Sequence, residues 1–141
     1  MDNLDNEMRL TFQAKSCNEA LARMTVAAFL TPLNPTLEEL ADTKTAVSEA
    51  VTNAIIHGYG ENGGTVEVWC GRRGKEVFFL VKDTGAGIPD IAAAMEPMYT
   101  TKPEMERSGM GFSFMEAFTD ELMVESAVGE GTVVKMKKVI G

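Results

Sequence analysis

The stretch SEAVTNAIIHGY, residues 48–59, decides the fold of this chain. Glu49, Asn53 and His57 are four residues apart, so on a helix they form one polar stripe. A solvated helix face also has this spacing, but apolar residues surround the stripe, which indicates the edge of a buried face. An amide one turn from a carboxylate offers an oxygen ligand for Mg²⁺ and a group that can orient an attacking oxygen, as phosphoryl transfer requires.

A second stretch, Asp83-Thr-Gly85-Ala-Gly87, directly follows an apolar run expected to be a buried strand. A tight turn is one interpretation, because Asp and Gly dominate turns. A dinucleotide-binding G-x-G-x-x-G pattern fails because Asp90 replaces its third glycine, and the P-loop pattern fails because position 69 is Trp. What remains is a carboxylate acceptor beside two glycines that let backbone approach a planar ring.

A third stretch, Ser108-Gly109-Met110-Gly111, precedes the helix expected over residues 112–118. It is either the end of a glycine-rich loop or a helix N-terminus whose free amides face a phosphate. Arg107 and Lys102 lie close enough in sequence to add positive charge for the transferred group.

The pattern of the remaining residues predicts an α+β fold: a two-layer sandwich with a mixed, mostly antiparallel sheet and helices on one face. Thr36 and Glu39 match a capping box that opens the long helix. A helix over 17–30 is expected to bury a stripe of Ala20, Leu21, Met24, Ala27 and Ala28. Strands are expected at residues 8–14, 66–70, 77–81, 122–128 and 132–140, with hairpin turns at 71–74 and 129–131. A short helix is expected over 89–95, followed by a flexible loop over 97–107.

Composition limits the class of protein. The 141 residues suit one domain, residues 1–141. A formal net charge of -8 argues against direct binding of nucleic acid through bulk charge. The longest apolar run, 24–30, is too short for a membrane span. No signal peptide is evident, and Cys17 and Cys70 form no metal or redox motif, so a cytoplasmic location with reduced thiols is expected.

In their order and contexts, the three stretches resemble the N, G1 and G2 boxes of the GHKL ATPases and kinases, which have the Bergerat ATP-binding fold. The resemblance implies that Asn53 binds Mg²⁺, that Glu49 is the base or orienting group, and that Asp83 accepts a hydrogen bond from adenine. It also implies that the residues of the later boxes and of an ATP lid contact ATP or ADP: Gly85, Gly87, Thr100, Thr101, Lys102, Ser108, Gly109, Met110, Gly111 and Thr132. Arg107 is assigned to catalysis. His57 matches no common N-box position and receives no role.

Residues 48–59 and 100–112 further resemble the anti-sigma serine kinases of spore-forming bacteria, the stage II sporulation protein AB family. That resemblance implies a homodimer that holds a sporulation sigma factor away from RNA polymerase. It also implies phosphorylation of a serine on an anti-anti-sigma partner, whose dephosphorylated form releases the sigma factor. Arg23 falls at the helix position that contacts both partners. The loop at 60–64 is one residue shorter than is usual in this family. The loop is not needed for catalysis, so the difference affects only how the partner proteins fit against the chain.

Three alternatives share these boxes. One is a general-stress anti-sigma kinase, which differs only in its partner. Another is a histidine-kinase catalytic domain, although the chain contains a single histidine and no upstream helical dimerisation module. The last is a nucleotide-gated sigma-binding protein with a vestigial kinase step.

Overall fold

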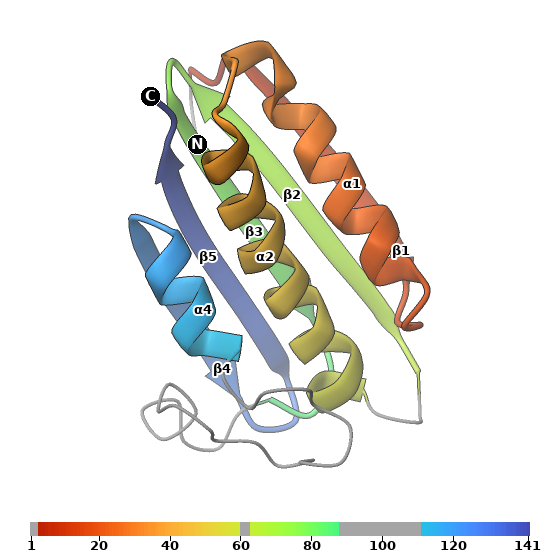
Figure 1. Ribbon diagram of the computed structural model, residues 1–141. Coiled ribbons are helices and arrows are strands. Elements are labelled where there is room, and N and C mark those ends of the chain that lie inside the picture. The colour runs from red at the N-terminus through yellow and green to blue at the C-terminus, as the bar shows by residue number, and fades with distance from the viewer. Residues whose placement is uncertain (1–2, 60–62, 88–110) are drawn as a thin grey trace.

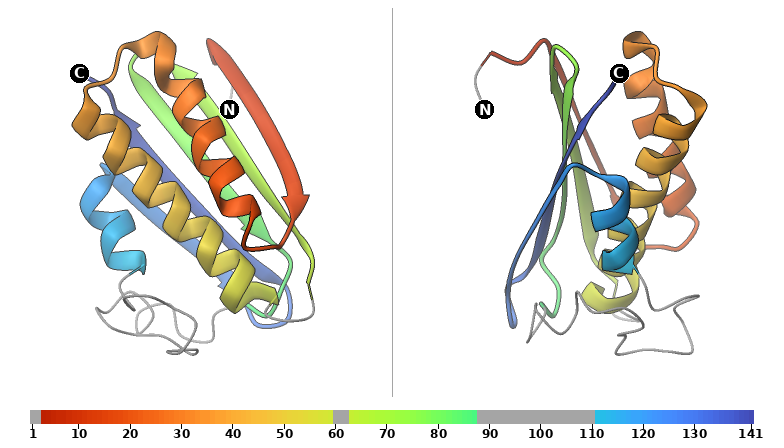
Figure 2. Two further views of the ribbon diagram at one scale, coloured as in Figure 1. Left: turned by 45° about the vertical axis from the view of Figure 1, so that its right-hand side comes forward. Right: turned by 60° about the vertical axis from the view of Figure 1, so that its left-hand side comes forward.

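The computed structural model describes residues 3–59, 63–87 and 111–141. Five strands form one antiparallel sheet in the order β1-β2-β3-β5-β4, and helices α1, α2 and α4 cover one face of it (Figures 1 and 2). The elements are β1 (Asn6–Gln13), α1 (Asn18–Leu30), the 3-10 turn η1 (Thr31–Leu33), α2 (Leu37–Asn53), the π-helix η2 (Ala54–Tyr59), β2 (Thr65–Arg73), β3 (Glu76–Asp83), α4 (Gly111–Phe118), β4 (Glu121–Ala127) and β5 (Gly131–Val139). The predicted two-layer α+β fold is confirmed.

The core lies between the sheet and the helices because alternate strand residues point to the helical face. The register aligns Phe12 with Val66 and Val68 with Val81, and then Val81 with Val134. All five side chains belong to the buried core. The alternation of apolar residues at 8–14 and 66–70 therefore identified the buried face correctly. The prediction that the continuous apolar run 77–81 is buried on both faces is wrong, because Phe78 and Leu80 on the face away from the helices are only partly buried.

Helix α1 begins and ends close to the predicted bounds, but the predicted buried stripe is wrong. Leu21 is 48% exposed and Met24 60% exposed. The side chains that pack into the core are instead Ala22, Val26, Phe29 and Leu30. Apolar residues surround this helix, so periodicity alone could not identify the face that contacts the sheet.

Helix α2 begins with the predicted capping box. The Thr36 hydroxyl accepts a hydrogen bond from the amide of Glu39 at 3.0 Å, and the Glu39 carboxylate accepts one from the amide of Thr36 at 2.9 Å. The other Glu39 oxygen accepts from the amide of Gly141 at 2.7 Å, which ties the C-terminal residue to the start of α2. These hydrogen bonds from backbone amides lower the pKa of Glu39, and the bond from Gly141 contributes more than the bond from Thr36.

The hairpin between β2 and β3 turns later than predicted. Gly71 remains in the strand and pairs with Phe78, and the turn is Gly74-Lys75. A Cβ on Gly71 would lie 2.6 Å from Cζ2 of Trp69. Glycine is therefore required here because the indole ring covers the strand, and not because the chain turns.

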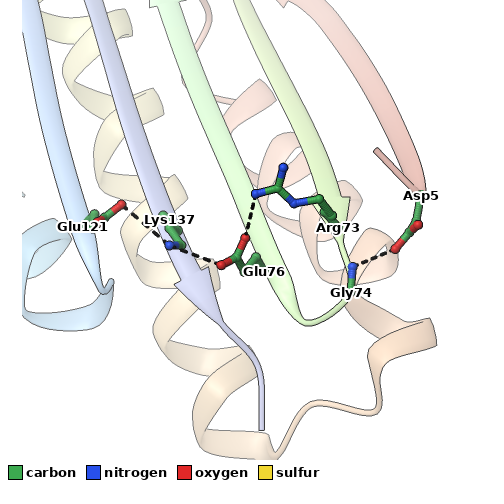
Figure 3. Close-up of polar contacts among 6 residues, drawn as sticks. All are labelled: Asp5, Arg73, Gly74, Glu76, Glu121 and Lys137. Carbon is green, nitrogen blue, oxygen red and sulfur yellow. Dashed lines mark hydrogen bonds and ion pairs between the residues drawn. The ribbon is translucent and has the colours of Figure 1, made fainter. Parts of the chain in front are cut away.

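The sheet face opposite the helices carries paired charges (Figure 3). Glu76 contacts Arg73 at 3.1 Å and Lys137 at 3.5 Å, and Lys137 also lies 4.0 Å from Glu121. The hydrogen bond from Arg73, followed by the charge of Lys137, lowers the pKa of Glu76. Such exposed pairs contribute little stability, but they make this face polar at its edges.

The helix predicted over 89–95 and the loop predicted over 97–107 lie outside the described residues. Among the helices that are described, none combines the length and the apolar character needed to cross a membrane.

Candidate functional site

The C-terminal end of α2 meets the first residue of α4. A Cβ on Gly111 would lie 3.2 Å from Oε2 of Glu49, 3.3 Å from Nδ2 of Asn53 and 3.4 Å from its Oδ1. The absence of a side chain at Gly111 therefore lets the first turn of α4 lie close against both polar groups, where even a methyl group would be crowded. The structure thus brings together the candidate base, the candidate metal ligand and the last glycine of the third stretch.

Asn53 is the last α-helical residue before the π-helical segment η2, which contains His57. A π-helix is uncommon and frequently marks a functional site, because its wider turn changes the direction of the side chains that follow. The change of helical pitch directly after Asn53 is a second, independent indication that this end of the helix has a function.

Asp83 ends β3 and is only 6% exposed. Its Oδ1 accepts a hydrogen bond from the amide of Gly85 at 3.0 Å, and the backbone of Thr132 also donates to the carboxylate. Burial raises the pKa of Asp83, and these two hydrogen bonds oppose the rise. A buried carboxylate with remaining acceptor capacity is suited to a ligand amino group.

Glycine is required beside Asp83 by close backbone contact. Gly131 has φ +107°, and a Cβ there would meet the carbonyl oxygen of Asp83 at 2.2 Å. Gly87 has φ +79°, and a Cβ there would meet the carbonyl oxygen of Ala127 at 2.2 Å. The turn between β4 and β5 therefore packs directly against the 83–87 segment and holds it in place.

Thr132 lies opposite Asp83 in the sheet register and is 8% exposed. Its hydroxyl oxygen lies 2.8 Å from that of Ser126, which also donates to the carbonyl of Gly131 at 2.9 Å. Ser126 was not among the predicted site residues. The predicted turn at 129–131 would pair residue 132 with residue 128, whereas the observed turn at 128–130 pairs Thr132 with Ser126.

Arg23 lies on α1, on the side of the helix that faces a pocket shared with α2. Its Nε is 3.2 Å from Oε2 of Glu19. Both atoms are buried, and neither makes a hydrogen bond within the described part of the chain. Arg23 also lines a pocket of about 360 Å³ that extends to Glu49.

The remaining predicted site residues, Thr100, Thr101, Lys102, Arg107, Ser108, Gly109 and Met110, lie outside the described residues. Among the described residues, no group of three or more His, Cys, Asp or Glu side chains gathers in a metal-binding arrangement. The donor atoms of Glu49 and Asn53 beside Gly111 nevertheless suit Mg²⁺, because a carboxylate and an amide oxygen are hard oxygen ligands and Mg²⁺ keeps several waters and binds few protein groups.

Comparison with known proteins identifies the class of domain to which the chain belongs. The family model of the histidine kinase-like ATPase domain matches residues 12–138, so the chain belongs to that class of ATP-binding domains. The described fold is also found in two solved structures. One contains the RsbU and RsbW domains of a Mycobacterium tuberculosis protein (TM-score 0.70, 20% identity, 96% of this chain and 32% of that one). The other is the catalytic domain of the histidine kinase ThkA (TM-score 0.57, 17% identity, 94% of this chain and 97% of that one).

Curated relatives define the family more narrowly. The anti-sigma F factor of Clostridium kluyveri is 56% identical over 135 residues, which cover 96% of this chain and 95% of that protein. The anti-sigma F factor of Geobacillus kaustophilus is 56% identical over 134 residues, 94% of this chain and 92% of that protein. This chain belongs to the anti-sigma F factor family, as its resemblance to the sporulation anti-sigma kinases predicted.

Proposed function

We propose that this chain binds ATP with Mg²⁺, transfers the γ-phosphoryl group to a serine of an anti-anti-sigma protein, and binds a sigma factor. The observation that carries the proposal is the close approach of Gly111, at the start of α4, to Glu49 and Asn53. A carboxylate and an amide next to the start of a helix combine the base, the metal ligand and the phosphate-binding amides that phosphoryl transfer requires.

In this proposal Asp83 accepts a hydrogen bond from the exocyclic amino group of adenine. Two backbone amides already orient the carboxylate, so the remaining acceptor positions are fixed before the ligand arrives. A carboxylate cannot donate a hydrogen bond to the carbonyl that guanine carries at the same position, which gives a preference for adenine. Thr132, on the neighbouring strand β5, contacts the adenine ring through its hydroxyl group.

The chemical step is a single displacement. The serine oxygen forms a bond to the γ-phosphorus while the bond to the oxygen that bridges the β- and γ-phosphates breaks, giving phosphoserine and ADP. Glu49 orients the hydroxyl and receives its proton. Mg²⁺ bound through Asn53 supplies positive charge that neutralises the phosphates. The predicted contributions of Arg107, Lys102 and the amides of residues 108–111 belong to the same step.

Partner binding is assigned to the exposed face of α1. Arg23 is flanked there by Leu21 and Met24, which are 48% and 60% exposed. A guanidinium between exposed apolar side chains is typical of the residues that dominate binding energy at protein interfaces. We assign this face to the sigma factor and the anti-anti-sigma protein, and we expect the chain to act as a homodimer.

The test is phosphorylation of a dephosphorylated anti-anti-sigma protein with Mg-[γ-³²P]ATP. We expect acid-stable label on the partner, loss of at least about 100-fold in rate for Glu49→Gln, and unchanged ATP binding. Glu38→Gln is the matched control, because it changes an exposed carboxylate at the opposite end of the same helix. Arg23→Glu should lose partner binding and keep ATP binding, as measured by pull-down and calorimetry.

Other outcomes would separate the alternatives. Acid-labile label would indicate phosphohistidine and hence a histidine-kinase activity. Sigma binding that depends on nucleotide, with no phosphorylation of any partner, would indicate a nucleotide-gated binding protein. Normal phosphorylation by Glu49→Gln would remove Glu49 from its assigned role.

A further inference from the structure

The groove between α1 and α2 contains a pocket of about 360 Å³, a volume at the lower end of the range for ligand sites. Its lining residues come from both helices: Glu19, Arg23, Ala41, Lys44, Thr45, Ser48 and Glu49. Glu49 therefore lies both beside Gly111 and in the lining of this pocket. A protein segment that presents a hydroxyl to Glu49 would have its neighbouring residues in the pocket.

The charged side chains that line the pocket differ in whether they already have a partner of opposite charge. Arg23 and Glu19 neutralise each other through their ion pair at 3.2 Å. Lys44 lines the same pocket from α2, and within the described ranges its ammonium group pairs with no carboxylate. Besides Arg23, which is assigned to partner binding above, Lys44 is thus a second cation that can bind a partner group, and it has no competing ion pair in the described part of the chain.

We propose that Lys44 selects the protein substrate by pairing with an acidic side chain close to the phosphorylated serine. This inference rests on the proposed kinase function and adds a specificity-determining residue to it. The chain has a net charge of -8, so an acidic substrate segment is repelled overall and needs a local cation. Because Lys44 is the cation in the pocket lining that pairs with no described carboxylate, it fixes the place of the acidic side chain and thereby the register of the segment.

The position of the acidic residue follows from helix geometry. Lys44 and Glu49 are five residues apart on α2, which is about 7.5 Å along the axis at about 1.5 Å per residue. An extended segment covers this distance in about two residues at about 3.3 Å each. The carboxylate is therefore expected within about two residues of the serine that Glu49 orients.

The experiment is steady-state phosphorylation of the dephosphorylated anti-anti-sigma protein by the full chain. Lys44→Gln should raise the KM for the protein substrate about 3- to 10-fold, and leave the KM for ATP and kcat unchanged. The effect should shrink at 0.5 M salt, because partly exposed charge pairs are screened. Lys135→Gln is the control, since it removes an exposed lysine from β5 on the sheet face away from the helices.

A double-mutant cycle identifies the partner residue. Each acidic residue within two positions of the modified serine is changed to its amide, and one such change should raise the KM of the wild-type chain while having no further effect on Lys44→Gln. The proposal is overturned if Lys44→Gln leaves the KM for the protein unchanged, if it alters ATP binding instead, or if no acidic residue near the serine is coupled to it. These outcomes leave the kinase function standing, whereas an absence of label with the wild-type chain overturns both.

Discussion

Gly111→Ala tests whether the reaction site lies where Gly111 of α4 approaches Glu49 and Asn53 of α2. The glycine has no positive φ, so the backbone accepts alanine, and alanine favours a helix over glycine by roughly 0.5–1 kcal/mol. The new methyl would lie 3.2 Å from Oε2 of Glu49 and 3.3 Å from Nδ2 of Asn53. Both atoms end flexible side chains, which can move by a few tenths of an ångström without unfolding the protein.

The expected result is a separation of stability from activity. The two effects on stability oppose each other, so the free energy of unfolding should change by less than about 1 kcal/mol, and Tm by less than about 4 °C. Activity should respond more strongly, because a misplacement of about 1 Å at a reacting group can cost about 100-fold in rate. We expect kcat for phosphorylation to fall about 10-fold, which corresponds to about 1.4 kcal/mol in the barrier.

The assay pairs thermal unfolding with initial rates at saturating ATP. Ser113→Ala is the control, because it changes the same helix without adding an atom near Glu49 and Asn53. Wild-type kcat in a stable Gly111→Ala protein would refute the placement of chemistry beside Gly111. A large fall in Tm together with lost activity would instead mean that the methyl acts through folding.

Three further predictions follow from the fold. Thr36→Ala removes the hydroxyl of the capping box and should lower the free energy of unfolding by about 1 kcal/mol, measured by urea titration; an unchanged midpoint would contradict the importance of the cap. Burial raises the pKa of Asp83, so its contribution to stability is full below the unfolded-state pKa of about 4 and is lost as the pH rises through the folded-state value. The free energy of unfolding of Asp83→Asn should therefore rise relative to that of wild type between pH 4 and pH 7. A difference between the two proteins that stays constant over this range would argue against a raised pKa of Asp83. Burial also raises the pKa of the Cys70 thiol to about 12, whereas Cys17 is exposed, so iodoacetamide at pH 8 should label Cys17 alone until guanidinium unfolds the chain.

The amino-acid sequence alone determined the elements and most of their faces. The capping box at Thr36 and Glu39 was predicted correctly because both hydrogen bonds are local. The buried faces of the strands at 8–14 and 66–70 were also predicted correctly, since alternation depends only on neighbouring residues. The family followed from the three short stretches, whose order along the chain is a property of the sequence.

Where local pattern was ambiguous, the predictions were wrong. Helix α1 buries Ala22 and Val26 and exposes Leu21 and Met24, because an alanine-rich helix offers two apolar faces and only the packing against the sheet selects one. Gly71 suggested a turn, yet it continues β2 because the Trp69 ring needs the space of a missing side chain.

Only the tertiary structure decided which polar groups share a site. It places Glu49 and Asn53 against Gly111, and it aligns Asp83, Thr132 and, from the far edge strand, Ser126. It also forms the pocket between α1 and α2. These contacts join residues far apart in the sequence, and they depend on strand register and helix packing, which are set by burial of the whole core rather than by any local stretch.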